Sequence, residues 1–154
     1  MAIRDILTWP DPRLTRACAP VPEGASAAPL IADLFETMYA APGRGLAAPQ
    51  IGAMQRVFVM DTTWKEGERK PMCFVNPTLV GHARETVSGE EGCLSIPGVM
   101  MTVPRYAWVD IEWRDATGGQ STRQFEGFAA VCVQHEIDHL DGMVTFDRLR
   151  PDAR

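Results

Sequence analysis

GFAAVCVQHEIDHLDG, residues 127–142, joins an apolar run to two histidines, His135 and His139, that lie four positions apart. The spacing predicts an α-helix that ends at Gly142, because glycine commonly follows the last turn of a helix. Residues 128–133 are apolar nearly all round, so we expect this helix to be buried. A buried helix of this kind belongs at the centre of the fold, with the other elements packed around it.

On such a helix the two histidines lie on the same face, one turn apart, so both imidazoles can bind one metal ion. Glu136 lies about 100° round the helix from His135, close enough to face a metal-bound water without being a ligand. Two helix histidines with structural or solvated roles are the alternative. The apolar setting favours a metal, because a buried polar cluster is costly unless it is paired or coordinated.

Two histidines need a third protein ligand, and the residues after His139 do not offer the familiar ones. The long zinc-protease motif is matched through Gly142, but Thr145 stands where its third histidine belongs. The other common plan uses a glutamate from a later helix, and no glutamate follows His139. We therefore expect the third ligand upstream of the two histidines.

Two upstream cysteines are candidates. Cys132 shares a helix face with the first histidine but lies about 10 Å along the axis from His139, which favours core packing for Cys132. Cys93 lies in EEGCLSIPG (90–98), where Gly92 lets the backbone come close to a ligand. A thiolate with two imidazoles suits Zn(II), Fe(II), Ni(II) or Co(II). A buried, unreactive cysteine is the alternative for this segment.

The remaining segments predict a second helix and several strands. Residues 26–40 repeat apolar side chains at helical spacing, with Ser26 as a candidate N-cap and Pro42-Gly43 after the last turn. Alternating apolar and charged residues predict a strand at 105–115, which turns back at 117–119 as a hairpin. Further strands are expected at 56–60, 73–77, 78–89, 121–126 and 143–149. Because strands and helices do not alternate regularly, we expect an α+β fold of mostly antiparallel strands around the buried helix.

Length and composition indicate one compact domain, residues 1–154. Hydrophobic residues make up 45% of the chain and charged residues 23%, as in ordinary globular proteins. The net charge of −5 gives no nucleic-acid footprint, and no apolar run of about 18 residues would span a membrane. The start lacks the apolar stretch of a secretory signal, so we expect a cytoplasmic protein with four reduced cysteines rather than two disulfides.

The glycine-rich segment GRGLAAPQIG, residues 43–52, fits a variant of the dinucleotide-binding fingerprint. That interpretation fails, because a helix precedes the segment and Pro49 stands where a helix should open. Gln50 supplies an amide donor on a loop whose glycines allow close approach to a ligand. A purely structural turn is the alternative.

Three segments, GRGLAAPQ, EGCLS and QHEIDH, resemble in this order and at similar spacing the three motifs of the peptide deformylases. The likeness runs over nearly the whole chain. It implies that Cys93, His135 and His139 hold one divalent metal ion, and that Glu136 is the general acid and base.

The same resemblance implies further roles at the site. Gln50 and the backbone N–H of Leu94 would stabilise the oxyanion, and Gly45 would lie near the substrate backbone. Asp138 is a candidate to orient the histidines. A pair between Glu91 and Arg105 is a candidate brace for the cysteine strand. Solvated surface charges are the alternative for these last three residues.

The activity implied by the resemblance is hydrolytic. The family removes the N-formyl group from the initiator methionine of nascent polypeptides and releases formate. Fe(II) is its usual metal in the cell, and Zn(II), Ni(II) or Co(II) can occupy the site. Formyl-methionyl nascent peptides would be the substrates, with a transient contact to the ribosome in a cytoplasm of bacterial type.

Three features depart from the family pattern. Arg44 stands between two glycines where an aliphatic residue is usual, and it would narrow the cleft, bind acidic side chains of the peptide or turn to solvent. Met100 and Met101 replace polar or basic residues of many relatives, so substrate anchoring is expected to differ. The chain ends at Arg154, whereas many relatives continue into a further helix.

Two other functions compete with the deformylase. A non-catalytic or altered-specificity relative would bind peptide N-termini, as Arg44 suggests, but binding alone needs neither the proton shuttle of Glu136 nor the donor of Gln50. A metal-dependent endopeptidase would use the same helix, and the missing downstream ligand opposes it.

Overall fold

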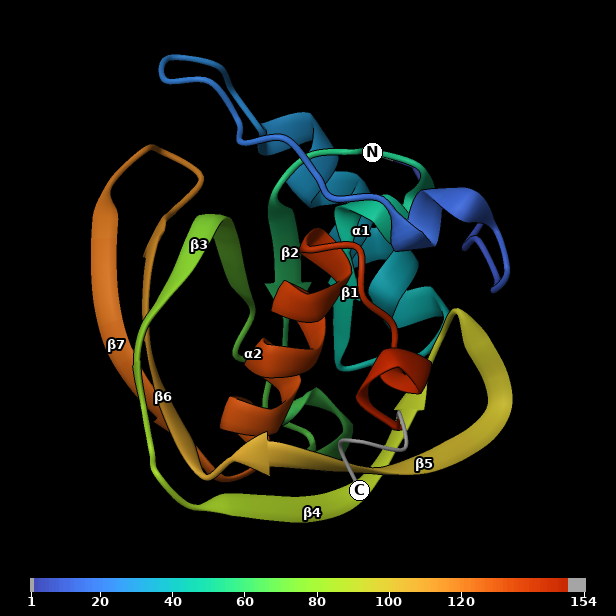
Figure 1. The fold of residues 1–154 in the computed structure, drawn as a ribbon. Helices are drawn as coiled ribbons and strands as arrows, with labels where there is room; N and C mark the ends of the chain where they lie inside the picture. Colours follow the sequence, from blue (N-terminus) through green and yellow to red (C-terminus); the bar gives the residue numbers. More distant parts are fainter. Residues whose placement is uncertain (1, 150–154) are drawn as a thin grey trace.

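Helix α2 (Gly127–Leu140) lies at the centre of the molecule and is surrounded by strands, as Figure 1 shows. The computed structural model describes residues 2–149 and confirms the expected α+β fold of mostly antiparallel strands. The other elements are α1 (Ala28–Ala40), β1 (Gly45–Ala47), β2 (Val57–Met60), β3 (Met72–His82), β4 (Thr86–Cys93), β5 (Ile96–Tyr106), β6 (Trp108–Arg114), β7 (Gln120–Glu126) and the 3-10 helices η1 (Pro12–Thr15), η2 (Ala48–Ile51), η3 (Trp64–Glu66) and η4 (Thr145–Leu149).

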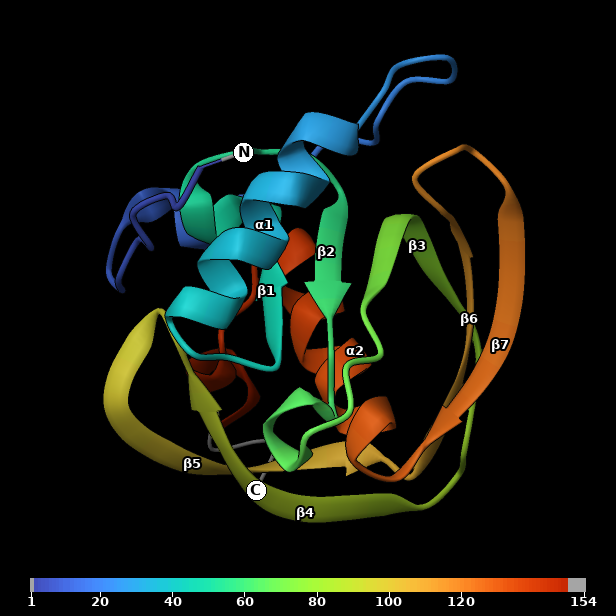
Figure 2. The same cartoon turned by 180° about the vertical axis from the view of Figure 1, so that it is seen from behind.

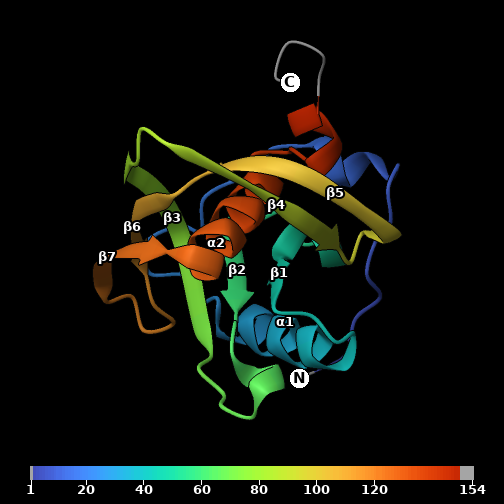
Figure 3. The same cartoon turned by 90° about the horizontal axis from the view of Figure 1, so that it is seen from below.

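The strands form two separate sheets. Five of them make one antiparallel sheet in the order β1–β2–β3–β6–β7, and β4 pairs only with β5 as a long hairpin. From behind, α1 is seen to cover β1 and β2 (Figure 2). Seen from below, α2 lies between the β4–β5 hairpin and the layer of β1, β2 and α1 (Figure 3). Helix α2 therefore has one face against the large sheet and another against the hairpin.

The face of α2 that meets the large sheet is apolar. Val133 and Ile137 lie in one buried cluster with Phe58 and Phe74, whose rings stack with their centroids 4.3 Å apart. Burying side chains of this size contributes about 1.5–3 kcal/mol each. This burial stabilises a helix that has no side-chain cap at its N-terminus. It also leaves the polar residues of α2 facing the hairpin.

Helix α2 begins at Gly127 and ends before Gly142, as predicted, but the burial of its first turn differs from the prediction. Gly142 lies just beyond the helix with φ 77°, the left-handed conformation that favours glycine. A Cβ there would lie 2.9 Å from the carbonyl carbon of Arg16. Phe128 was expected to be buried and is 55% exposed, because it lines a cleft beside the helix.

The strand expected at 143–149 is wrong, since Thr145–Leu149 forms η4. Its turn closes on itself, because Asp147 N–H donates to the Val144 carbonyl at 2.9 Å and the Asp147 carboxylate accepts from Val144 N–H at 2.9 Å. These local bonds satisfy backbone groups that a strand would have to pair with a neighbour.

The prediction of separate strands at 73–77 and 78–89 is also wrong, because β3 runs continuously through both segments to His82. Its pairing with β6 shifts between Val75 and Thr78, and Asn76 there has φ 50°. The Asn76 side chain holds the backbone of Val21 with two hydrogen bonds of 2.8 and 2.9 Å. The spacing of apolar residues along β3 does not reveal this register shift, because it depends on contacts with the distant Val21 segment.

The sequence prediction missed strands β1 and β5 and the 3-10 helices η1, η2 and η3. Residues 105 and 106 were assigned to the next strand, but they end β5. Ala107 forms a bend between β5 and β6, and its N–H donates to the Glu85 carbonyl at 3.1 Å. Prolines inside β5 conceal it, since proline is unusual within a paired strand. The expected glycine loop contains β1 and η2.

Within residues 2–149, none of the helices has the length and apolar character needed to cross a membrane.

Candidate metal centre

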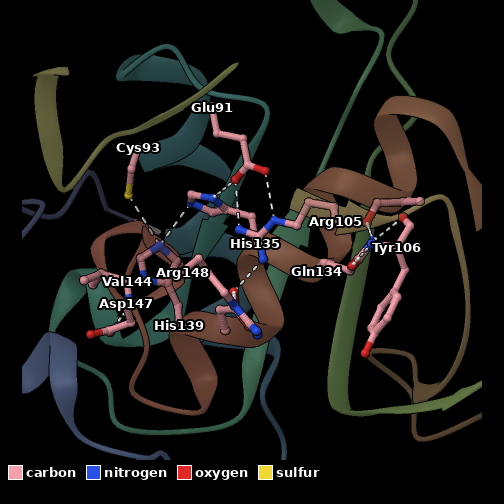
Figure 4. Close-up of polar contacts among 12 residues, drawn as sticks. Glu91, Cys93, Arg105, Tyr106, Gln134, His135, His139, Val144, Asp147 and Arg148 are labelled. Atoms are coloured by element: carbon pink, nitrogen blue, oxygen red, sulfur yellow. Dashed lines mark hydrogen bonds and ion pairs between the residues drawn. The ribbon is translucent and has the colours of Figure 1, made fainter. Parts of the chain in front are cut away.

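The polar face of α2 and the end of β4 bring together Cys93, His135 and His139. Their candidate ligand atoms all lie within 4.8 Å of one another. The two histidine Nε2 atoms are 3.2 Å apart, and Cys93 Sγ is 3.4 Å from His139 Nε2. Figure 4 shows the three side chains pointing toward one another. The cysteine comes from a strand and the histidines from a helix, so the group exists only because the hairpin closes onto α2.

These separations fit a divalent metal ion. A tetrahedral zinc with bonds of about 2.0 Å to nitrogen and 2.3 Å to sulfur would place two nitrogens about 3.3 Å apart and a sulfur and a nitrogen about 3.5 Å apart. Two imidazoles and a partly buried thiol that face one point are costly without a cation between them. The residues therefore fit the metal that the motif implies. Cys132 does not join the group and packs in the core, as expected.

The electrostatic settings of the two histidines differ. Burial opposes a charge on His135, but hydrogen bonds to Cys93 and Glu91 outweigh it and raise the pKa of His135 to about 10. Burial and the neighbouring His135 lower the pKa of His139 well below its usual value. His139 Nδ1 is buried without a hydrogen-bond partner within residues 2–149. His135 is thus anchored by acceptors, and His139 is held neutral. A metal ion binds neutral imidazole, so a cation between the two rings would favour the neutral form of both.

Glu91 is the residue that orients His135. Its Oε1 lies 2.9 Å from His135 Nδ1, and Arg105 donates to both of its oxygens at 2.8 and 2.9 Å. Burial disfavours the charged carboxylate, but the bonds from Arg105 and His135 prevail and bring the pKa of Glu91 to about 2. A carboxylate behind a ligating histidine fixes the ring and its tautomer. The expected Glu91–Arg105 pair is therefore present, and it is buried rather than on the surface.

Within residues 2–149 the Asp138 side chain makes no hydrogen bond to either histidine, in contrast to its expected role. It accepts from Arg105 Nη1 at 2.5 Å and from Arg148 at 2.6 and 3.0 Å. Arg105 thus joins two buried carboxylates, and Arg148 brings η4 to the same network. The sequence offered no signal for Arg148, because its partner is reached only when the chain folds back after α2.

Glu136 and Gly45 lie against each other. Glu136 is buried, and its Oε1 has no hydrogen-bond partner within the described residues. Burial raises the pKa of Glu136 to about 7, although His135 nearby opposes the shift. A Cβ on Gly45 would lie 2.5 Å from Glu136 Oε2 and 3.0 Å from Cys132 Sγ. Gly45 therefore leaves the space that the glutamate occupies.

The Gln50 side chain is fixed beside Cys93. It is 2% exposed, accepts from Ala47 N–H at 2.9 Å and donates through Nε2 to Ser95 Oγ at 3.0 Å. The same Nε2 lies 3.8 Å from Cys93 Sγ. Ser95 is fully buried, and the sequence analysis gave it no role. Its place two residues after the candidate cysteine is the signal that would have found it.

A cleft of about 470 Å³ opens beside the ligand group. Seven of the eight site residues expected from the sequence line it, and His139 lies behind them. The seven are Arg44, Gly45, Gln50, Cys93, Leu94, His135 and Glu136. Apolar side chains complete the lining, among them Met100, Phe128 and Val131. The arrangement places a metal group, a carboxylate and an amide around one space large enough for part of a peptide.

Fold and site together define a class: an α+β protein that presents a cysteine and an H-E-x-x-H helix as a metal-binding group in a cleft. The model of the polypeptide deformylase family matches residues 3–154. The chain belongs to this family.

Individual relatives agree with the family match. The chain is 45% identical to a peptide deformylase of Afipia carboxidovorans over 97% of its own length and 88% of that protein. It is 47% identical to one of Alkalilimnicola ehrlichii, over 97% and 83%. The peptide deformylase of Legionella pneumophila has a similar structure, with a TM-score of 0.90 at 42% identity over 99% and 89% of the two chains. That of Thermotoga maritima has a TM-score of 0.90 at 36% identity over 98% and 100%.

Proposed function

We propose that this protein is a peptide deformylase, a metal-dependent hydrolase that removes the N-formyl group from the initiator methionine of nascent polypeptides and releases formate. The observation that carries the proposal is the convergence of Cys93, His135 and His139 beside Glu136, in a cleft of this family's fold. A binding-only protein has no support in the fold or in the relatives, which are deformylases.

Cys93, His135 and His139 would hold the metal, one ion per chain. When bound there, a divalent metal lowers the pKa of a water molecule and so supplies a nucleophile near neutral pH. We propose Fe(II) as the metal in the cell, with Zn(II), Ni(II) or Co(II) able to replace it. One thiolate and two imidazoles are a suitable donor set for each of these ions.

Glu136 is the proton carrier in this proposal. It accepts a proton as water adds to the formyl carbon, and it delivers that proton to the amine as the carbon–nitrogen bond breaks. Its unpartnered Oε1 supports the role, because that atom is free to meet the attacking water. The second proton of the water leaves the new carboxylic acid and protonates the amine, so the products are formate and a peptide with a protonated amino terminus, and atoms and charge balance.

Gln50 Nε2 and the backbone N–H of Leu94 are proposed to stabilise the negative charge that develops on the formyl oxygen. Ala47 and Ser95 hold the Gln50 amide in place, so little reorganisation is needed during the reaction. Losing one such donor costs about 2–4 kcal/mol of transition-state stabilisation.

Gly45 is proposed to lie along the substrate backbone. The apolar lining from Phe128 and Val131 supports a site for the methionine side chain, which buries favourably against such surfaces. Arg44 is proposed as a further substrate-binding residue.

Residues 1–154 are proposed to act as a single catalytic domain in a cytoplasm of bacterial type. The nature of the substrate supports this placement, since formyl-methionyl chains emerge from the ribosome there. A transient contact with the ribosome is part of the same proposal.

The test is formate release from formyl-Met-Ala-Ser by protein purified without air and loaded with Fe(II) or Ni(II). Glu136→Ala serves as the matched variant. We expect turnover by the unmodified protein, and a loss of about 10²–10⁴-fold in the variant with its metal content unchanged. Unmodified protein that binds one metal per chain and releases no formate would contradict the proposal.

A further inference from the structure

Arg44 lines the cleft from the residue just before β1. Its backbone carbonyl accepts from Asp61 N–H at 2.9 Å, and its guanidinium carbon lies 5.6 Å from the centre of the Phe128 ring. Neither contact neutralises its charge. The side chain is 32% exposed, so a cation lies at the wall of the cleft in reach of a bound peptide.

The partner that neutralises Arg44 is weakly held. Arg44 Nη2 donates to Glu66 Oε1 at 2.9 Å, and the Glu66 side chain is 64% exposed on η3. Exposed ion pairs contribute little, because water screens the charges and two long side chains must be ordered. Arg44 Nε, in contrast, is buried with no partner within residues 2–149. The guanidinium is thus only partly satisfied by the protein.

A second cation stands beside this pair. Lys65 lines the same cleft, and its ammonium lies 5.8 Å from the centre of the Trp64 ring. Trp64 Nε1 in turn donates to the Gly43 carbonyl at 2.8 Å, which ties η3 to the segment that carries Arg44. This part of the cleft wall therefore holds two cations, and the exposed Glu66 carboxylate that pairs with Arg44 is exchangeable.

We propose that Arg44 is a specificity-determining residue that binds an acidic side chain of the peptide after the formyl-methionine, in competition with Glu66. The inference rests on the proposed function of the cleft and names a preferred substrate class. Glu90 of β4 also lines the cleft. Because Glu90 opposes an acidic side chain elsewhere in the cleft, we expect the preference only at the peptide position whose side chain lies beside Arg44 and Lys65.

The experiment compares aspartate with its neutral isostere asparagine. The kcat/KM for deformylation is measured for formyl-Met-Asp-Ser against formyl-Met-Asn-Ser, and for formyl-Met-Ala-Asp against formyl-Met-Ala-Asn. In the unmodified protein we expect aspartate to be preferred about two- to fivefold at one of the two positions, the range of an exposed ion pair.

Variants of Glu66 and Arg44 test the contribution of each residue to the preference for aspartate. Glu66→Gln removes the competitor and is expected to increase the preference for aspartate. Arg44→Gln is expected to abolish the preference, and Arg44→Lys to retain part of it. Glu68→Gln is the control in the same loop, since Glu68 pairs only loosely with Lys70 at 3.5 Å, and it should behave as the unmodified protein.

Equal rates for aspartate and asparagine in both the unmodified protein and Glu66→Gln would overturn the inference. A preference that persists in Arg44→Gln would do so as well. Calorimetric binding compares Met-Asp-Ser with Met-Asn-Ser and Met-Ala-Asp with Met-Ala-Asn, in the unmodified protein and in Arg44→Gln. It needs no turnover, so it decides the inference even if no peptide is deformylated. In that event the proposed function fails, while an Arg44-dependent difference in affinity would still support acidic recognition.

Discussion

Gly45 contributes to this site through its lack of a side chain, which leaves room for the Glu136 carboxylate. Gly45 and Glu136 come from segments far apart in the sequence, yet a single added carbon would bring them to 2.5 Å. Real Cβ atoms do not approach an oxygen so closely, so any larger residue at this position must displace the glutamate or the strand. The glycine is a requirement of packing around the reacting group.

Gly45→Ala is therefore expected to lower kcat for formate release by about 100-fold, because a shift of about 1 Å in a catalytic group has that effect. Metal content should stay the same, since no ligand moves. Gly89→Ala is the matched control, because a Cβ on Gly89 meets nothing within 4 Å. Equal kcat in both variants would show that Glu136 tolerates the displacement.

Substitution of the two cysteines that line the cleft is expected to have opposite effects on metal binding. Cys93→Ser should lower the affinity for metal, because a hydroxyl replaces a thiolate at a position 3.4 Å from His139 Nε2. Cys132→Ser should keep the metal, because its sulfur belongs to the core cluster. Metal per chain after dialysis measures both. If Cys132→Ser lost the metal while Cys93→Ser kept it, Cys132 rather than Cys93 would be the metal ligand.

At the scale of elements, the charged network connects three pieces of the chain. Arg105 of β5 holds Glu91 of β4 and Asp138 of α2, and Arg148 of η4 reaches the same aspartate. The side chain of Arg105 is only 3% exposed, whereas that of Arg148 is 41% exposed. Water can replace Arg148 but not Arg105, so the two arginines should differ in their effect on stability.

Arg105→Met is expected to lower the free energy of unfolding by about 3–5 kcal/mol, because it leaves the buried Glu91 carboxylate without its arginine and Asp138 with Arg148 alone. Arg148→Met should cost about 1 kcal/mol or less, since the pair is partly screened by solvent. Urea denaturation measures both values. Similar losses for the two variants would mean that the buried part of the network is not the stabilising part.

Across the whole molecule, a bound metal would tie the β4–β5 hairpin to α2. Cys93 and the two histidines lie on separate elements, and the hairpin makes no ladder to the five-stranded sheet. A ligand that binds only the folded state stabilises it in proportion to its concentration and affinity. The hairpin should therefore depend on the metal more than the large sheet does.

Removing the metal with a chelator is expected to lower Tm and to speed amide exchange in β4 and β5 ahead of β2 and β3. Returning the metal should reverse both effects. In Cys93→Ser the same treatment should change little. Uniform exchange over both sheets after chelation would show that the hairpin is held by packing alone.

The sequence by itself determined the central helix, the histidine pair and the α+β class. Helical spacing puts His135 and His139 on one face whatever surrounds them, and Gly142 ends the helix by its own conformational freedom. The expected hairpin of β6 and β7 also follows from local alternation and a glycine turn. Cys93 was reached only through the likeness of three ordered motifs, because nothing local distinguishes it from a buried, unreactive cysteine.

Tertiary structure alone decided the contacts between distant segments. It made β3 continuous, turned residues 145–149 into η4, buried the Glu91–Arg105 pair and paired Arg44 with Glu66. The physical reason is the same in each case. Local spacing sets which way a side chain points from its own helix or strand, whereas its partner is chosen only when a remote segment closes onto that face.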